Sequence, residues 1–171
     1  MASPDAMTLF DFEDANEVAW TVVNDGVMGG HSEGYVKRTA DGTLRFTGTL
    51  VTEGGGFTSA RTEKAVDLSG YDGLALRVRG GGRSFQVDVR DGTQVRGMSL
   101  SRRASFPTSA DWQTVRVPFS ALGKSVRGRA VPGAPPLEPS AVQGLALFMA
   151  DGQNGAFRLE VDAIRAYRAE E

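Results

Sequence analysis

Short segments, most of them alternating between apolar and polar residues, run through the chain. They lie at residues 44–50, 74–79, 85–90, 115–119, 144–149 and 157–162. Gly, Asp, Ser or Pro residues bound these segments, and the periodicity of amphipathic helices is nearly absent. The pattern predicts antiparallel strands, most of them with one apolar and one polar face.

A sheet with one apolar face must cover that face, and strands without helices can cover it only with a second sheet. We therefore expect an all-β protein, a two-sheet antiparallel β-sandwich of jelly-roll type. A chain of 171 residues fits one domain. We predict a single domain over residues 9–168, a disordered extension at 1–8 and a tail at 169–171. The Gly- and Pro-rich segment 126–139 is interpreted as a long surface loop.

The segments at 74–79 and 85–90 flank a glycine-rich turn, which predicts a hairpin with one polar face. This polar face would carry Arg77, Arg79, Asp88 and Arg90. Such a face is either solvated and crossed by ion pairs, or an array of guanidinium forks that recognises an anionic partner. Both interpretations place the four side chains on neighbouring strands.

The aromatic residues divide into predicted core anchors and candidate ligand platforms. Trp20 and Trp112 each begin a predicted strand, which favours a place in the core. Sugar recognition needs an aromatic face beside polar groups. The candidates for an exposed platform are Tyr35, Phe57, Phe106 and Phe148.

A glycine-rich segment from Trp20 to Ser32 leaves a predicted strand and enters a loop whose residues tolerate positive φ. It is either a tight connection or a binding loop. The candidate binding residues here are Asn24, Asp25, Gly26, Met28, Gly29, Gly30 and Ser32, joined by Gly55, Gly56, Phe57 and Arg61 from a second cluster. No helix is predicted to follow the glycine clusters, so a phosphate cradle is not favoured.

Composition excludes several kinds of chemistry. The chain has no cysteine and a single histidine, His31, so thiolate chemistry and multi-histidine zinc sites are ruled out. We expect no metal, no cofactor and no catalysis. Two alternatives stay open: Asp11, Glu13 and Asp162 offer oxygen ligands for a structural calcium ion. Asp88 with Arg79 is the one acid–base pair that could serve in catalysis. A net charge of −2 without a basic block argues against nucleic acid. No apolar run could span a membrane and no export signal is evident, so we expect a cytoplasmic protein.

Several ordered motifs resemble the complex I intermediate-associated protein family. They are Trp20-x-x-Val23-Asn24-Asp25-Gly26-Val27-Met28-Gly29-Gly30-x-Ser32, Phe46-x-Gly48, Gly55-Gly56-Phe57-x-Ser59-x-Arg61, Asp67-Leu68-Ser69-x-Tyr71-Asp72-Gly73-Leu74, Trp112-x-x-Val115-x-Val117-Pro118-Phe119 and Gly155-x-Phe157-x-Leu159-Glu160-Val161. The resemblance runs from Phe10 to Tyr167. One departure is Gly81, where the family often has Asp.

The resemblance implies a galactose-binding-like sandwich and a protein partner. Mitochondrial members of the family are assembly factors that act as chaperones for respiratory complex I, so an assembly intermediate of a respiratory complex is the expected partner. Stand-alone members of this length resemble bacterial proteins. The alternative is a carbohydrate-binding module, because the galactose-binding-like fold hosts many of them.

Overall fold

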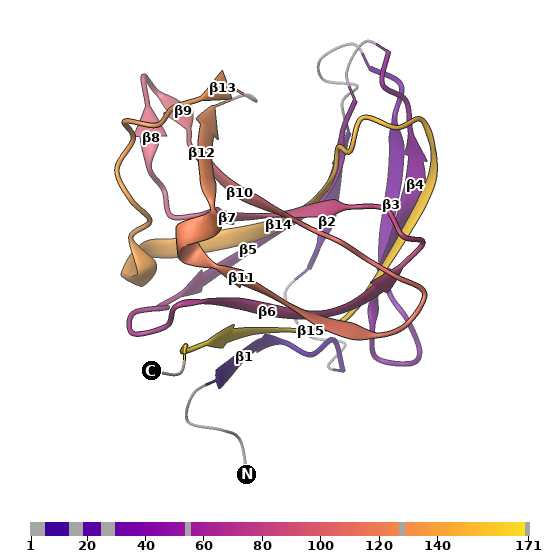
Figure 1. The fold of residues 1–171 in the computed structure, drawn as a ribbon, viewed down its shortest axis with the longest axis horizontal. Coiled ribbons are helices and arrows are strands. Elements are labelled where there is room, and N and C mark those ends of the chain that lie inside the picture. Colours follow the sequence, from indigo (N-terminus) through magenta and orange to yellow (C-terminus); the bar gives the residue numbers. More distant parts are fainter. Residues whose placement is uncertain (1–5, 14–18, 25–29, 54–55, 127–128, 170–171) are drawn as a thin grey trace.

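A computed structural model describes residues 6–13, 19–24, 30–53, 56–126 and 129–169 of the chain. Antiparallel strands dominate the described residues, and the helical elements there are the two 3₁₀ turns η2 (Phe119–Ala121) and η3 (Pro139–Ala141). None of the described helical elements is long and apolar enough to cross a bilayer. The strands form two main sheets and one small hairpin (Figure 1).

The first sheet has six strands. Its order is β11 (Gln113–Pro118), β6 (Gly73–Gly80), β15 (Gly155–Tyr167), β4 (Leu44–Leu50) and β3 (Glu33–Arg38), and β1 (Ala6–Phe10) also pairs with β15. Strand β15 is long enough to pair with β4 near its start and with β1 near its end, while β6 follows its other edge. It therefore ties together the two termini of the domain.

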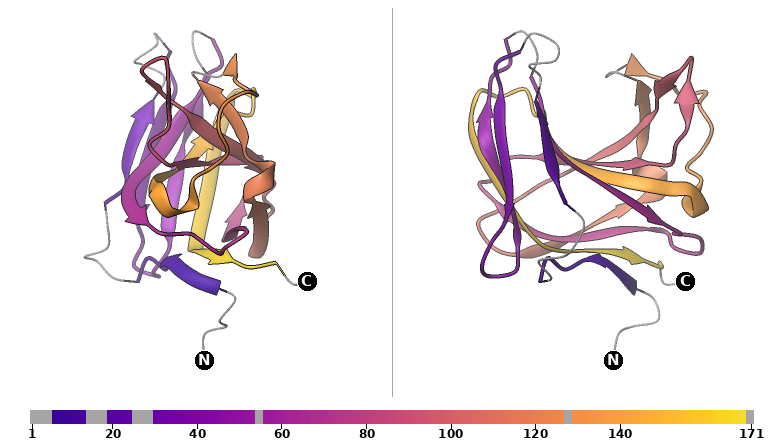
Figure 2. Two further views of the ribbon diagram at one scale, coloured as in Figure 1. Left: turned by 90° about the vertical axis from the view of Figure 1, so that its left-hand side faces the viewer. Right: turned by 180° about the vertical axis from the view of Figure 1, so that it is seen from behind.

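The second sheet has seven strands. Its order is β13 (Arg129–Ala130), β12 (Gly123–Val126), β10 (Ser101–Phe106), β7 (Phe85–Arg90), β14 (Val142–Met149), β5 (Thr58–Val66) and β2 (Thr21–Asn24). A separate hairpin joins β8 (Gln94–Val95) to β9 (Met98–Ser99). In Figure 2, β8, β9, β12 and β13 rise at one end of the molecule and β3 and β4 rise at the other.

The apolar faces of the two sheets meet in one large core. At its centre the ring of Phe157 lies 5.0 Å from that of Phe46 and 6.0 Å from that of Phe85, measured between centroids. Burying rings of this size contributes more to folding than any other side-chain class. The core confirms the predicted all-β, two-sheet antiparallel sandwich.

The hairpin predicted from 74–79 and 85–90 is wrong. Strand β6 belongs to the six-stranded sheet and β7 to the seven-stranded sheet, so the chain crosses between layers at this turn. Both strands point their apolar residues into the core, but from opposite sides of it. Alternation records which face is buried, and it is equally compatible with strands side by side or face to face.

Several predicted positions also need correction. Trp20 packs on Phe10 in the core as predicted. Trp112 instead lies half-buried on the outer face of the six-stranded sheet. Phe106, proposed as an exposed platform, is buried and stacks on Phe85. Tyr35 is exposed as expected, at 62%.

The predicted boundaries differ slightly from the strands. Residues 6–8 were expected to precede the domain, yet they belong to β1, which pairs with the end of β15. The segment 126–139 contains strand β13 and a buried alanine, Ala134, so it is partly structured against β12. The small hairpin of β8 and β9 was not predicted, because two-residue strands carry no detectable alternation.

Candidate functional site

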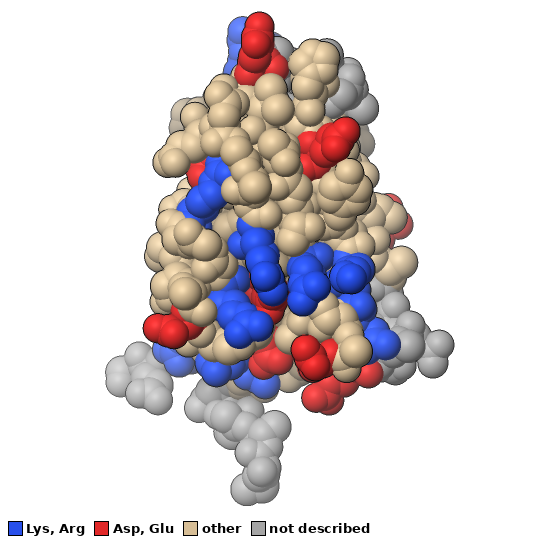
Figure 3. Space-filling view, turned by 90° about the vertical axis from the view of Figure 1, so that its right-hand side faces the viewer, with Lys and Arg blue, Asp and Glu red and all other residues tan. Residues whose placement is uncertain are grey.

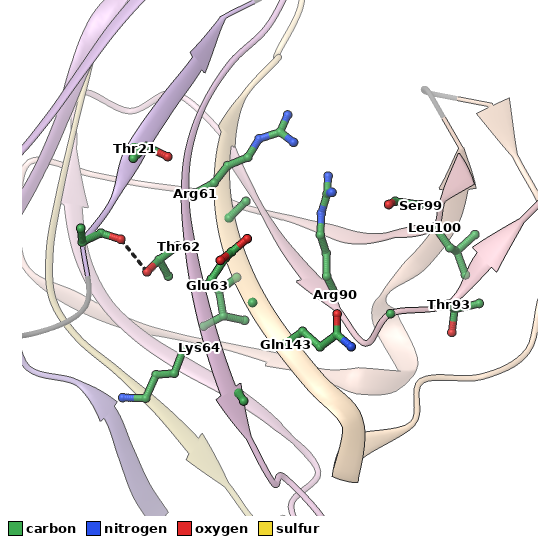
Figure 4. A pocket seen from close by; sticks show the side chains of 16 residues that line it. Thr21, Arg61, Thr62, Glu63, Lys64, Arg90, Thr93, Ser99, Leu100 and Gln143 are labelled. Atoms are coloured by element: carbon green, nitrogen blue, oxygen red, sulfur yellow. Dashed lines mark hydrogen bonds between the residues drawn. The ribbon is translucent and has the colours of Figure 1, made fainter. Parts of the chain in front are cut away.

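A cleft of about 950 Å³ opens on the face of the seven-stranded sheet that points away from the core. Residues of β5, β7 and β14 line it, and the segment that contains β9 borders it. Its polar lining includes Thr21, Arg61, Glu63, Arg90, Thr93, Ser99 and Gln143. In Figure 4, Arg61 and Arg90 extend in the same direction from neighbouring parts of the floor.

Strand register places a small residue between charged ones in the floor of the cleft. Ala146 on β14 pairs with Arg61 on β5 and with Asp88 on β7. Asp88 pairs in turn with Arg103 on β10. Residues that pair directly across antiparallel strands share a face. Charged side chains from three strands therefore surround a position that contributes only a methyl group.

Gly144 repeats this arrangement two residues earlier on the same strand, between Glu63 and Arg90. A Cβ atom at this position would lie 2.7 Å from the carbonyl oxygen of Thr62, so any larger residue must displace backbone. The hollow exists because the central strand carries small residues here, while its neighbours carry long ones.

Asp88 organises the floor as a buried carboxylate. Its side chain is fully buried and accepts a hydrogen bond of 2.9 Å from the backbone N–H of Arg102. The Nε atoms of Arg103 and Arg90 lie 3.4 and 3.5 Å from Oδ2. A buried charge is stable only when it is paired. Asp88 consequently holds two guanidinium groups in place while remaining closed to solvent.

Positive charge exceeds negative charge on this floor. Arg61 donates from Nε to the hydroxyl of Ser59 at 2.8 Å, and no ion pair joins it to a carboxylate within the described residues. Burial lowers the pKa of Arg61, and the nearby charge of Arg90 lowers it further, whereas Asp88 acts in the opposite direction. Burial is also the main cause that lowers the pKa of Arg103. Three guanidinium groups therefore share one buried carboxylate.

The aromatic ring in the floor is covered by arginines. Phe148 is only 1% exposed, which corrects its proposed role as an open platform. The guanidinium carbon of Arg103 lies 3.7 Å from the ring centroid, and that of Arg61 lies 5.1 Å from it. Phe57 packs nearby, with its ring centroid 6.0 Å away. Cation–π stacking thus orders the two arginines and removes the ring as a surface for a ligand.

A second buried ion pair supports the border of the cleft. Arg102 is 1% exposed and lies 3.0 Å from Asp91. It also donates to the carbonyl of Pro135 and the hydroxyl of Thr93. Burial raises the pKa of Asp91, but hydrogen bonds from Glu138 and Thr93 and the charge of Arg102 together bring it below its ordinary value. Through these contacts the pair links the segment that follows β7 to the segment that precedes β14.

The predicted glycine-rich loop lies only partly within the described residues. Asn24 ends β2 and accepts a hydrogen bond of 2.5 Å from the hydroxyl of Thr58. Ser32 is buried and bonds both the N–H and the carbonyl of Val51. These contacts close the base of the loop. Of the other predicted residues, Gly30 and Gly56 are described, and Asp25, Gly26, Met28, Gly29 and Gly55 lie outside the described residues.

Arg77 and Arg79 lie on the opposite side of the molecule from Asp88. They extend from β6 over Trp112, with guanidinium carbons 5.9 and 4.7 Å from its ring centroid. Arg77 pairs with Asp162 at 3.8 Å and Arg79 with Glu160 at 2.7 Å. The predicted grouping of these two arginines with Asp88 is therefore wrong, because it depended on the hairpin.

Glu160 is the centre of a group of arginines on this outer face. Figure 3 shows that Lys and Arg side chains gather, with a few Asp and Glu side chains, on the lower half of the side of the molecule that carries β3 and β4 in Figure 1. The carboxylate is almost completely buried and contacts Arg45, Arg79 and Arg158. Burial raises the pKa of Glu160, but hydrogen bonds from Arg158 and Arg79 outweigh it and lower the pKa. Arg45, Arg77, Arg79 and Arg158 on this face each lie within ion-pair distance of a carboxylate, whereas Arg61 in the cleft has no such partner among the described residues.

Sequence reasoning found Arg61 and Asp88 but missed Arg103 and Ala146. The alternation of Leu100, Arg102, Ala104 and Phe106 was a usable signal for β10, although two adjacent arginines obscured it. The importance of Ala146 has no signature in the sequence, because it depends on which strands flank β14. Among the described residues, no group of three or more His, Cys, Asp or Glu side chains could hold a metal ion.

Two known proteins are similar to this chain in sequence over most of its length. Complex I intermediate-associated protein 30 of mouse is 26% identical over 184 residues, a match that covers 95% of this chain and 56% of the mouse protein. The corresponding Drosophila melanogaster protein is 27% identical, with 91% and 61% covered. The chain thus spans less than two thirds of either relative.

Among solved structures, a family 11 carbohydrate-binding module from Clostridium thermocellum, in complex with a β-1,3-1,4-mixed-linked tetrasaccharide, superimposes with a TM-score of 0.71. It is 16% identical, and the match covers 99% of each chain. This likeness shows the fold alone. The profile of complex I intermediate-associated protein 30 matches residues 10–161, which is most of the chain. The chain belongs to the complex I intermediate-associated protein 30 family.

Proposed function

We propose that this chain is a non-catalytic protein-binding module that holds a partner chain in the cleft of the seven-stranded sheet, in an assembly or chaperone role. Family membership supports a protein partner, because the mouse and Drosophila relatives are named for their association with complex I intermediates. An assembly intermediate of a respiratory complex is the partner we propose.

The observation that carries the proposal is the chemistry of the cleft floor. The side chains of Arg61 and Arg103 cover the ring of Phe148, and small residues of β14 leave an open channel beside them. Guanidinium groups suit the charged and polar groups of a protein surface, and arginine is enriched at protein interfaces. The dimensions of the cleft suit a segment of chain better than a flat contact.

The same residues support a role without catalysis. Asp88 is buried and paired with Arg90 and Arg103, so its carboxylate has no access to a substrate. Glu63 is the one carboxylate in the described lining of the cleft. Glycosidase chemistry needs two carboxylates across the scissile bond. Nucleophilic chemistry needs a base beside a hydroxyl or thiol, and neither arrangement is found in the described lining.

The test is affinity capture from cells that contain both this protein and respiratory complex I. Thr21 is exposed in the cleft and pairs with Arg61, so Thr21→Trp should fill the space without changing charge. Thr114→Trp on the outer face of the other sheet is the matched control. We expect the control to retain complex I subunits by mass spectrometry and Thr21→Trp to lose them, with melting temperatures close to the wild type.

A different result would move or remove the site. If Thr114→Trp loses the partner and Thr21→Trp keeps it, the binding face is the arginine-bearing outer sheet. If wild-type protein retains no respiratory-complex subunit, the assembly role itself is wrong.

Carbohydrate binding remains the alternative, favoured by the likeness to the family 11 module. The covered ring of Phe148 argues against it, because sugar rings stack on open aromatic faces. Calorimetry with the mixed-linked tetrasaccharide separates the two functions. Saturable heat that disappears in Thr21→Trp would establish the alternative, and its absence would leave the protein-binding role.

A further inference from the structure

We infer that the cleft recognises carboxylate groups, and that its occupant is an acidic peptide segment held by Arg61 and Arg90. This inference rests on the proposed protein-binding function and adds the chemical class of the partner. It starts from the unequal charge of the floor, where three arginines lie near two carboxylates, the buried Asp88 and the exposed Glu63.

Arg61 and Arg90 are the two arginines placed to receive a ligand. They line the cleft from β5 and β7, on either side of β14, and Figure 4 shows both extending beyond the floor. Within the described residues, the terminal nitrogens of neither side chain have a hydrogen-bond acceptor. The Nε atom of Arg90 is buried and also makes no hydrogen bond there, although Asp88 lies 3.5 Å away. Donors are therefore left over on both sides of the channel.

The positions of these donors are fixed before any ligand arrives. Arg61 is held by Ser59 and by the ring of Phe148, and Arg90 is held by Asp88. A guanidinium fork that is already ordered loses little conformational entropy on binding. The channel over Ala146 leaves space between them for a carboxylate to contact both forks.

Electrostatics favours an anion in this space. Arg90 and Arg103 repel the charge of Arg61, and burial strengthens the repulsion because water is partly excluded. A carboxylate between the forks relieves this repulsion and forms charge-assisted hydrogen bonds. Glu63 borders the same cleft and supplies the one opposing charge of the described lining.

A peptide fits these features better than an acidic polysaccharide. A uronate polymer offers carboxylates too, but its sugar rings need an open aromatic face, and Phe148 lies beneath Arg61 and Arg103. Apolar and hydroxyl groups at the border, including Leu100, Thr21 and Ser99, match the mixed surface of a peptide. We therefore commit to a peptide with several Asp or Glu residues.

The experiment titrates the full chain with three probes by calorimetry. The first is an N-acetylated, C-amidated octapeptide of alternating Glu and Ala, the second its Gln–Ala counterpart, and the third an oligogalacturonate of equal charge. We expect the Glu peptide alone to bind measurably, and Arg61→Gln or Arg90→Gln to weaken it about tenfold, the effect of one charge-assisted hydrogen bond. Glu63→Gln should tighten it, and Arg116→Gln, on the outer face of the other sheet, should leave it unchanged.

Three outcomes would overturn the inference: no heat with the Glu peptide, equal weakening by Arg116→Gln, or tighter binding of the oligogalacturonate. The capture experiment with Thr21→Trp is independent of charge. If Thr21→Trp loses the partner while the Glu peptide fails to bind, the cleft is the binding site and its preference for carboxylates is wrong. If Thr21→Trp keeps the partner, the cleft is not the protein-binding site, and the proposed function is refuted whatever the peptide titration gives.

Discussion

Replacing Asp88 by Asn should destabilise the protein strongly, although the two side chains have nearly the same size and shape. The substitution keeps the shape and an acceptor for the N–H of Arg102, but it removes the charge that compensates Arg90 and Arg103. Breaking a buried ion pair on one side costs about 3–5 kcal/mol. Because Asn retains one hydrogen bond, we expect the lower end, about 3 kcal/mol.

This loss is measurable because domains are only marginally stable, by about 5–15 kcal/mol. In a chain of this size, 1 kcal/mol shifts the melting temperature by about 2–4 °C, so Asp88→Asn should melt roughly 6–12 °C lower. Urea unfolding followed by circular dichroism gives the free energy directly. The matched control is Asp162→Asn, which breaks the half-exposed pair with Arg77 and should cost about 0–1 kcal/mol.

A double substitution tests the cause. Asp88→Asn combined with Arg103→Gln removes one of the uncompensated positive charges, so its cost should be smaller than the sum of the two single costs. Surface substitutions usually change the free energy of unfolding by no more than about 0.5 kcal/mol. If Asp88→Asn changes it by no more than this, the floor does not depend on the carboxylate and the reasoning is refuted.

Three further predictions concern the fold. Burial raises the pKa of Asp91 and Glu160, but hydrogen bonds and the charges of nearby arginines outweigh it and bring both below their ordinary values of 3.8 and 4.5. Their contribution to stability is therefore complete above about pH 5 and should be lost as the pH falls through the folded pKa values, seen as declining stability in acid urea titrations. Gly144→Ala should cost about 1–3 kcal/mol in the same assay, because its methyl group meets the carbonyl of Thr62, and an unchanged midpoint would contradict the packing of β14 on β5. Phe85→Ala should cost about 3–5 kcal/mol through the cavity left between the sheets, whereas a loss below about 1 kcal/mol would mean that the ring is not central to the core.

The candidate site shows which functional residues the local sequence pattern can identify and which it cannot. Asp88 was recognisable because it occupies a polar position in a predicted strand, and Arg61 because it follows a glycine cluster that was taken as a binding segment, although the strand that carries it, β5, was not predicted. Of the two ion-pair partners of Asp88, Arg90 was predicted on the same polar face, but the other partner was not recognised. Arg79 was grouped with Asp88 through an assumed hairpin, and the second partner, Arg103, comes from β10, a strand that was not predicted.

The sequence by itself determined the class of the protein. Alternation of apolar and polar residues, as in 44–50 and 157–162, dictates strands with one buried face, and two such faces cover each other. Ordered motifs along the chain were also enough to indicate the family. Only the tertiary structure decided which strands are neighbours, and therefore that Ala146 lies between Arg61 and Asp88. The physical reason is that alternation fixes the face on which a side chain lies, whereas the pairing of distant strands follows from how the whole core packs.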